Sequence, residues 1–291
     1  MDRHTQSWQD IEREARQCGV DFPDFQKVWP LLSKLIALQH DVRTRPPASV
    51  WETESPDLSG EKPLLKALSP EKPALVEHTK RVVSALVNAS PEAVPSPEAL
   101  EEVVDGRSKQ LVQDLPSDPG KCCRELEKAG ISHDVGTLFL WAVFSPFFWQ
   151  AREEILRSRD LAGWSQGSCP VCGARPHMAK LRDEDGARIL ECWLCGAEWQ
   201  FLRLKCPFCG NVDQKTLGFF YLDEDPGRRV HFCKACGSYL KVVDIRRLKR
   251  DPILPVYNLA TLQYDTAAVS EGFRPGSGLI WVDGLSGVQS E

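Results

Sequence analysis

Apolar residues recur at three- and four-residue steps through most of the first 168 residues. In "FQKVWPLLSKLIALQHDV", residues 25–42, they form a single stripe, which predicts an amphipathic helix with Pro30 in its first turn. Residues 46–119 contain eleven of the 21 prolines, and this region is expected to form helices interrupted by loops. The run "VGTLFLWAVFSPFFWQAREEILRS", residues 135–158, is apolar around most of its circumference. We therefore expect a buried helix pair at the centre of an all-helical domain.

Past Gly167 the apolar positions alternate instead, which is the period of a β-strand. Residues 177–192 consist of two alternating runs joined by an Asp-Gly turn, and residues 216–233 repeat the design with a Pro-Gly turn. Both segments predict β-hairpins. Each hairpin is followed by another strand-like run, "EWQFLRL" after the first and "YLKVVDI" after the second. The chain thus contains an internal repeat of 37 residues, measured from Cys169 to Cys206.

The last region contains one more helical pattern, "NLATLQYDTAAVSEGF", for which we expect Asn258 as the N-cap and an end near Gly272. These patterns together predict an α+β protein. The expected order is an all-helical domain at 1–166, two tandem β modules at 167–205 and 206–250, and a short C-terminal helix and tail at 251–291.

Composition and charge narrow the function. The chain of 291 residues is 42% hydrophobic, enough for a sizeable core, and its formal net charge is −5. Residues 169–250 carry 15 Lys and Arg against 10 Asp and Glu, whereas both flanks are acidic, so the chain as a whole does not predict a polyanion partner. The N-terminus lacks a secretory pattern, and the longest apolar window, residues 136–149, is too short for a bilayer. We therefore expect a cytoplasmic protein without a membrane span.

Eleven cysteines in a reducing compartment favour metal binding or thiol chemistry over disulfides. Four Cys-x-x-Cys-Gly motifs occur, two in each repeat, and this spacing lets both thiolates of a motif face one ion while the glycine adopts a positive φ. Sequential pairing of the motifs is favoured by the repeat, although spacing also permits a cross-brace between the first and third motifs. The predicted metal ligands are Cys169, Cys172, Cys192 and Cys195 at one site and Cys206, Cys209, Cys233 and Cys236 at the other.

Four thiolates suit zinc and also a mononuclear iron, and the spacing does not choose between them. Each divalent ion with four thiolates carries a net charge of −2. The neighbouring Arg203, Lys205, Lys234 and Lys241 either offset that charge or form an ordinary solvated strand face. His177 and His231 lie close to the motifs and are expected to be ordinary strand residues, with replacement of a thiolate as the alternative.

The three remaining cysteines have no ligand partner nearby in sequence. We interpret Cys18, Cys122 and Cys123 as buried or surface thiols, with redox sensitivity left open for the adjacent pair. Because protein sulfurs fill each predicted metal site, no coordination position is open for a substrate. The sequence also lacks a phosphate-binding glycine loop, a nucleophile elbow and an H-E-x-x-H motif, so we expect a protein that is not an enzyme, without catalytic or organic-cofactor-binding residues.

The tandem motifs behind a helical region resemble the FdhE-type formate dehydrogenase accessory proteins. The resemblance lies in "CPVCGARPHMAKL", "ECWLCGAEWQFLRLKCPFCGN", "HFCKACGSYLKVVDI" and "NLATLQYD". It implies two rubredoxin-like modules that hold two metal ions through the eight cysteines, with iron favoured and zinc as the alternative. It further implies a cytoplasmic assembly factor that binds the catalytic subunit of respiratory formate dehydrogenase before export, and a homo-oligomer is possible.

Two other functions stay open at this point. The basic block between residues 169 and 250, with aromatic residues on its strands, is also typical of a zinc-ribbon protein that binds nucleic acid. An electron-transfer protein of rubredoxin type is the third hypothesis, and it requires iron with a reversible potential.

Overall fold

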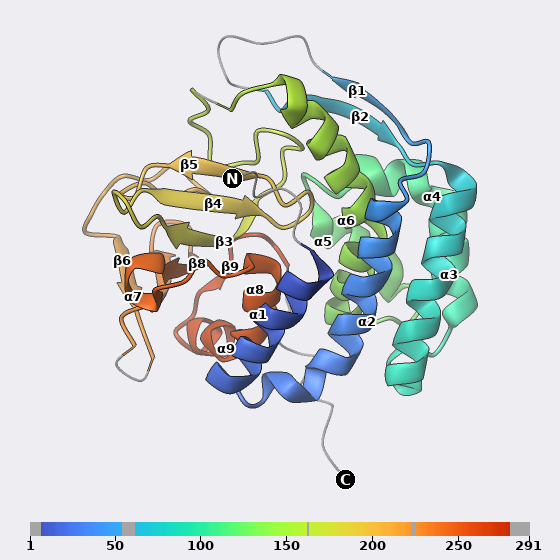
Figure 1. The fold of residues 1–291 in the computed structure, drawn as a ribbon, viewed down its shortest axis with the longest axis horizontal. Coiled ribbons are helices and arrows are strands. Elements are labelled where there is room, and N and C mark those ends of the chain that lie inside the picture. The colour runs from blue at the N-terminus through green and yellow to red at the C-terminus, as the bar shows by residue number, and fades with distance from the viewer. Residues whose placement is uncertain (1–6, 54–61, 162, 223–224, 280–291) are drawn as a thin grey trace.

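The computed structural model describes residues 7–53, 62–161, 163–222 and 225–279. Most helices of the N-terminal half lie on one side of the molecule and the large sheet on the other, with the C-terminal helices beside the sheet (Figure 1). This mixture of helices and sheet agrees with the predicted α+β class. The end of the predicted tail, residues 280–291, lies outside the described ranges. Within those ranges no helix combines the length and apolar character that a bilayer span needs.

Six α-helices and a short 3-10 helix form the N-terminal region: α1 Trp8–Asp21, α2 Phe25–Thr44, α3 Lys72–Ala89, η1 Pro91–Ala93, α4 Pro97–Asp114, α5 Pro119–Glu127 and α6 His133–Ser158. Ser7 begins α1 with a capping box, in which its hydroxyl accepts from the backbone N–H of Asp10 while the Asp10 carboxylate accepts from the backbone N–H of Ser7. The amphipathic helix predicted at residues 25–42 is α2, but Pro30 lies inside the helix rather than in its first turn.

The predicted buried helix pair is wrong, because α6 is one continuous helix of 26 residues. Pro146 lies within it and has no N–H to donate to the carbonyl of Ala142, four residues earlier. A side chain from α3 fills this gap, since His78 Nε2 lies 2.9 Å from the Ala142 oxygen. Gln39 of α2 donates to the preceding carbonyl, that of Trp141, at 3.0 Å. Buried polar groups on neighbouring helices thus let the proline stand inside a continuous helix.

Two strands interrupt the helices and were not expected from the sequence. Strands β1, Val50–Thr53, and β2, Leu65–Ser69, pair antiparallel. Both are mostly exposed, so neither carries the apolar alternation by which a strand is recognised in sequence. The start of β2 lies against the first cysteine motif. There the N–H groups of Leu64 and Leu65 donate to the carbonyls of Pro170 and Val171, both at 2.8 Å.

The cysteine-rich region forms one sheet. Its strands are β3 Pro176–Leu181, β4 Arg188–Cys192, β5 Glu198–Phe201, β6 Leu217–Phe220, β7 Arg228–Cys233, β8 Ser238–Asp244 and β9 Arg274–Pro275. Each repeat contributes an antiparallel trio, β5-β4-β3 and β8-β7-β6, as the two predicted hairpins require. The trios are joined by a parallel pairing of β3 with β8, which the repeat did not predict. The predicted domain boundaries stay a prediction. The β3–β8 pairing makes the strands of both modules parts of one hydrogen-bonded sheet.

The single C-terminal helix predicted from Asn258 is also wrong. After the short helix α7, Ile245–Leu248, the chain forms α8, Leu254–Ala260, and α9, Leu262–Ser270, with Asn258 buried inside α8. Lys241 of β8 donates through Nζ to the carbonyl of Asn258 at 2.7 Å and to Asp265 at 2.6 Å. The buried Lys241 ammonium therefore binds a backbone carbonyl near the end of α8. This gives a physical reason why α8 and α9 do not form one continuous helix.

Helix α1, near the start of the sequence, packs against α8, near its end, beside the sheet (Figure 1). Ion pairs also hold α1 to residues outside α8: Arg228 of β7 meets Asp21 at 2.7 Å, and Arg250, which precedes α8, meets Glu14 at 2.5 Å. Both arginines also lie over the ring of Tyr257. The N-terminal helix thus closes over the C-terminal elements that support the sheet.

Candidate metal centre

Four tight turns carry the Cys-x-x-Cys-Gly motifs, and all have the same backbone. The glycine that follows each second cysteine has a positive φ, between +65° and +80°, as the sequence predicts: Gly173, Gly196, Gly210 and Gly237. Its N–H donates back to the carbonyl of the first cysteine at 2.9 to 3.1 Å. A side chain at this φ would strain the turn, so glycine fixes the direction in which both thiols point.

The structure brings the eight cysteines of the motifs together in two groups. In each group the four sulfurs lie within 4.8 Å of one another, and the motifs pair sequentially rather than as a cross-brace: Cys169, Cys172, Cys192 and Cys195 form the first group, and Cys206, Cys209, Cys233 and Cys236 form the second. All eight thiols are free of disulfide bonds.

The sulfur spacing fits a tetrahedral metal. Zinc–sulfur bonds of about 2.3 Å place the corners of a tetrahedron about 3.8 Å apart. The sulfurs of Cys169 and Cys195 are separated by 3.5 Å, and those of Cys206 and Cys236 by 3.8 Å. These distances are far too long for disulfides and close to that edge. The donor set and its spacing therefore suit a tetrahedral zinc or iron ion, and they do not choose between these metals.

The two groups differ in exposure. All four cysteines of the first group are buried, whereas Cys209 of the second is exposed and Cys236 is half-buried. The first group lies beneath the helical region, where Trp149 and Arg152 of α6 approach Gly196. In the second group Cys206 and Cys233 are buried, so the group is only partly open to solvent.

Backbone and side-chain donors stabilise negative charge on the sulfurs. In the first group, Val171 donates its N–H to Cys169, and Leu194 donates to Cys192, both at 3.4 Å. In the second, the Asn211 amide donates to Cys233 at 3.5 Å. Burial raises the pKa of Cys233, but the donors around it outweigh burial and lower that pKa to about 7. By contrast, burial and neighbouring thiols raise the pKa of Cys172.

Of the other residues considered from the sequence, the two histidines and Lys241 have partners outside the sulfur groups. His177 meets Glu191 at 2.9 Å, and His231 stacks on Phe219, so neither belongs to a four-sulfur group. Lys241 is committed to Asp265, which excludes it as a counter-charge for the thiolates. Lys205 lies over the Phe201 ring.

The three remaining cysteines are buried thiols in the helical region. Cys18 lies on α1, and the adjacent Cys122 and Cys123 lie on α5. Burial raises the pKa of Cys122 to about 12 and that of Cys123 to about 11. At neutral pH these groups are protonated, which makes them poor nucleophiles and poor metal ligands.

Exposed apolar side chains are concentrated in the segment that joins the two modules and begins the second. Among the described residues, eight large apolar side chains are exposed, and five of them fall between positions 202 and 221: Leu202, Leu204, Val212, Phe219 and Tyr221. The Gln214 amide donates to the carbonyls of both Leu204 and Val212, which holds these two segments together. Exposed apolar side chains on segments that are held together in this way are typical of a contact surface.

Two arginines beside the cysteine motifs are not predicted by the sequence. Arg152 of α6 donates to the Gly196 carbonyl at 2.9 Å, and Arg188 of β4 donates to the carbonyls of Leu202 and Lys205. Each arginine thereby holds the backbone beside a cysteine motif. Arg188 occupies a position on the apolar face of its strand, and that break in the alternation is the one signal that could have identified it.

Comparisons with known proteins agree with this geometry. The family model "FdhE, central domain" matches residues 168–203, which contain the first cysteine group. A "Protein FdhE homolog" from Aquifex aeolicus (strain VF5) is 32% identical over 148 residues, which is 50% of this chain and 51% of that protein. One from Yersinia enterocolitica is 28% identical over 226 residues, 75% of this chain and 69% of that protein. The chain thus spans about half to two thirds of the length of these relatives.

A solved structure extends the likeness in fold. The crystal structure of the FdhE protein from Pseudomonas aeruginosa superposes with a TM-score of 0.60 over 96% of this chain and 98% of that one, at 21% sequence identity. The matches therefore confirm that this chain resembles the FdhE proteins, by sequence in the domain that carries its first cysteine group and by fold along nearly its whole length.

Proposed function

We propose that this chain is an accessory protein for respiratory formate dehydrogenase, which binds the catalytic subunit in the cytoplasm before export. The observation that carries the proposal is the pair of closed four-cysteine groups on an FdhE-like fold. The FdhE name of the relatives supports an accessory role rather than a catalytic one.

The chemistry of the sites agrees with this role. Each group offers four protein sulfurs to one ion, so a bound ion has no free position for a substrate. Such an ion links two turns of the chain and, if it is iron, can also exchange an electron. The eight cysteines would hold two ions, and the chain's own contribution is to orient the thiolates and to exclude water from the first group.

The nucleic-acid alternative receives little support from the charges. Although the second module is rich in arginine, most of these side chains are already paired with carboxylates. Arg228 pairs with Asp21 and Asp225, and both Arg229 and Arg246 pair with Asp244. A groove that tracks a phosphate backbone needs free cations.

The client would meet the exposed apolar side chains where the first module leads into the second. Leu204 and Val212 are 66% and 62% exposed and lie on segments joined by Gln214. A partially assembled subunit presents apolar surface, which makes this region a suitable contact for it.

A pull-down tests the proposal. The tagged chain, expressed anaerobically with its client, should retain the formate dehydrogenase catalytic subunit. A variant with Leu204→Ser and Val212→Ser should lose most of it, whereas a matched variant with Val20→Ser and Val50→Ser, which are also exposed, should not. Failure of the parent chain to retain the subunit would argue against the function. Equal retention by both variants would move the contact surface elsewhere.

A further inference from the structure

Each cysteine group is approached by one buried arginine. Arg152 is 6% exposed and donates to the carbonyl of Gly196, the residue after Cys195. Arg188 is 3% exposed and donates to the carbonyl of Lys205, the residue before Cys206. Two arginines from different elements thus occupy comparable places beside the two groups.

The two arginines differ in what balances their charge. Arg152 lies 3.1 Å from the carboxylate of Glu153. No carboxylate among the described residues lies within ion-pair distance of Arg188. Its side chain is nevertheless buried, at the start of β4 in the first module. Burial lowers the pKa of Arg188 to about 10, and the nearby Cys206 thiolate acts in the opposite direction. A buried guanidinium without a counter-ion is costly, so the structure must supply negative charge by other means.

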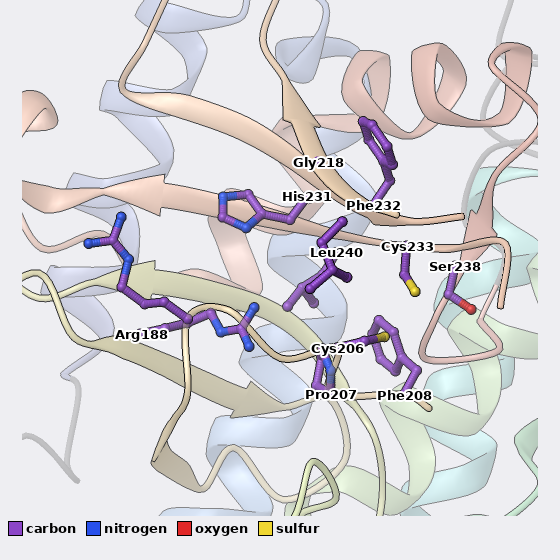
Figure 2. A pocket seen from close by; sticks show the side chains of 12 residues that line it. Arg188, Cys206, Pro207, Phe208, Gly218, His231, Phe232, Cys233, Ser238 and Leu240 are labelled. Carbon is purple, nitrogen blue, oxygen red and sulfur yellow. The ribbon is translucent and has the colours of Figure 1, made fainter. Parts of the chain in front are cut away.

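The surroundings of Arg188 contain one source of that charge. Arg188, Cys206 and Cys233 line one small cavity of about 40 Å³ (Figure 2). No Asp or Glu is among the residues that line this cavity. His231 lines the same cavity, and its buried Nε2 has no hydrogen-bond partner in the described chain. With a divalent ion bound, the four thiolates of the second group carry a net charge of −2 beside this cavity.

We infer that Arg188 is a positioning residue for the second metal site: its charge balances the thiolates, and its hydrogen bonds fix the segment that leads into Cys206. This inference rests on the metal occupancy proposed above. Arg188 thereby links the two modules, since it lies on a strand of the first module and its side chain acts on the second. Without the positive charge, the loaded site keeps an uncompensated negative charge in a partly buried setting, and the ion leaves more readily.

Metal release from the full-length, zinc-loaded chain tests the role of the charge. With excess chelator and a chromogenic zinc indicator, Arg188→Gln should accelerate the release of one ion about tenfold, the lower end of effects seen for residues that support metal ligands. Arg188→Lys keeps the charge but not the forked geometry, and it should stay within about twofold of the parent. Release of the other ion should not change in either variant.

The matched control is Arg152→Gln, which should leave the Arg188-sensitive phase of release unchanged. Equal acceleration by Arg188→Gln and Arg188→Lys would overturn the charge argument. If Arg188→Gln does not fold, as judged by circular dichroism, the folded Arg188→Lys variant decides alone, because tenfold faster release from it would also overturn the inference. A parent chain that holds no ion would overturn the proposed occupancy, whereas unchanged release from a loaded Arg188→Gln variant would overturn only the role of Arg188.

Discussion

At the residue scale, side chains far apart in sequence repair the backbone of the central helix. Pro146 leaves the Ala142 carbonyl without its helical donor, and His78 supplies one. To donate, His78 must carry its proton on Nε2, and Nδ1 is buried without a partner in the described chain. Burial lowers the pKa of His78 to about 4 from its ordinary 6.5. The neutral ring is therefore part of the folded state.

This linkage predicts a pH dependence. Between pH 6.5 and 4 the unfolded chain binds a proton at His78 that the folded chain does not, so stability falls as the pH falls through this window. The shift of about 2.5 units corresponds to about 3 kcal/mol. His78→Gln retains a donor but does not titrate. The free energies of unfolding of parent and variant can be measured by urea denaturation, with the metal content of both proteins kept the same. Their difference should shrink by up to about 3 kcal/mol on acidification. A difference that is constant from pH 7 to pH 4 would contradict this role.

Residue identity alone predicts the sulfur groups but not the groups that support them. A cysteine motif closed by glycine has a spacing that few other structures need, so all eight thiols could be named from the sequence. Arg152 and Arg188 have no such signal, because an arginine's partner carbonyls are chosen by tertiary packing. The sequence indicates Lys241 as a possible counter-charge for the thiolates, whereas in the structure it is buried against α9.

At the element scale, the errors arise where tertiary contacts override local signals. A proline inside an apolar run predicts a break, but α6 continues because α2 and α3 provide donors. Conversely, α8 and α9 are separate because Lys241 takes the carbonyls of Asn258 and Thr261. The hairpins were predictable, since alternation and turn residues are local signals.

The Lys241–Asp265 pair predicts a strong effect on stability at this junction. Both side chains are buried, at 3% and 4% exposure. Asp265→Asn retains an acceptor for Tyr239 but leaves the ammonium without a counter-ion, which should cost about 3 kcal/mol in free energy of unfolding. The double variant with Lys241→Met should recover part of this loss, because no buried charge is left. If urea denaturation shows the two single losses simply adding in the double variant, the ion pair is not what holds α9 on the sheet.

At the scale of the whole molecule, the repeat is a guide to the two modules but not to their junction. The parallel pairing of β3 with β8 joins them into one sheet, and α1 closes over its C-terminal supports. The result is asymmetric: the first sulfur group is fully buried, whereas the second is partly exposed through Cys209 and Cys236. This asymmetry suits the proposed function, in which the first site maintains the fold while a client is bound on the side of the second site.

The central claim is that two ions bind, one in each sequential group, and metal stoichiometry tests it most directly. The iron and zinc contents of the full-length chain, purified without oxygen, should together equal about two ions, as the two groups of four sulfurs require. Cys172→Ser and Cys206→Ser should each lose one ion and retain the other. A parent chain that holds a single ion, or a variant that loses both ions while still folded, would contradict the account.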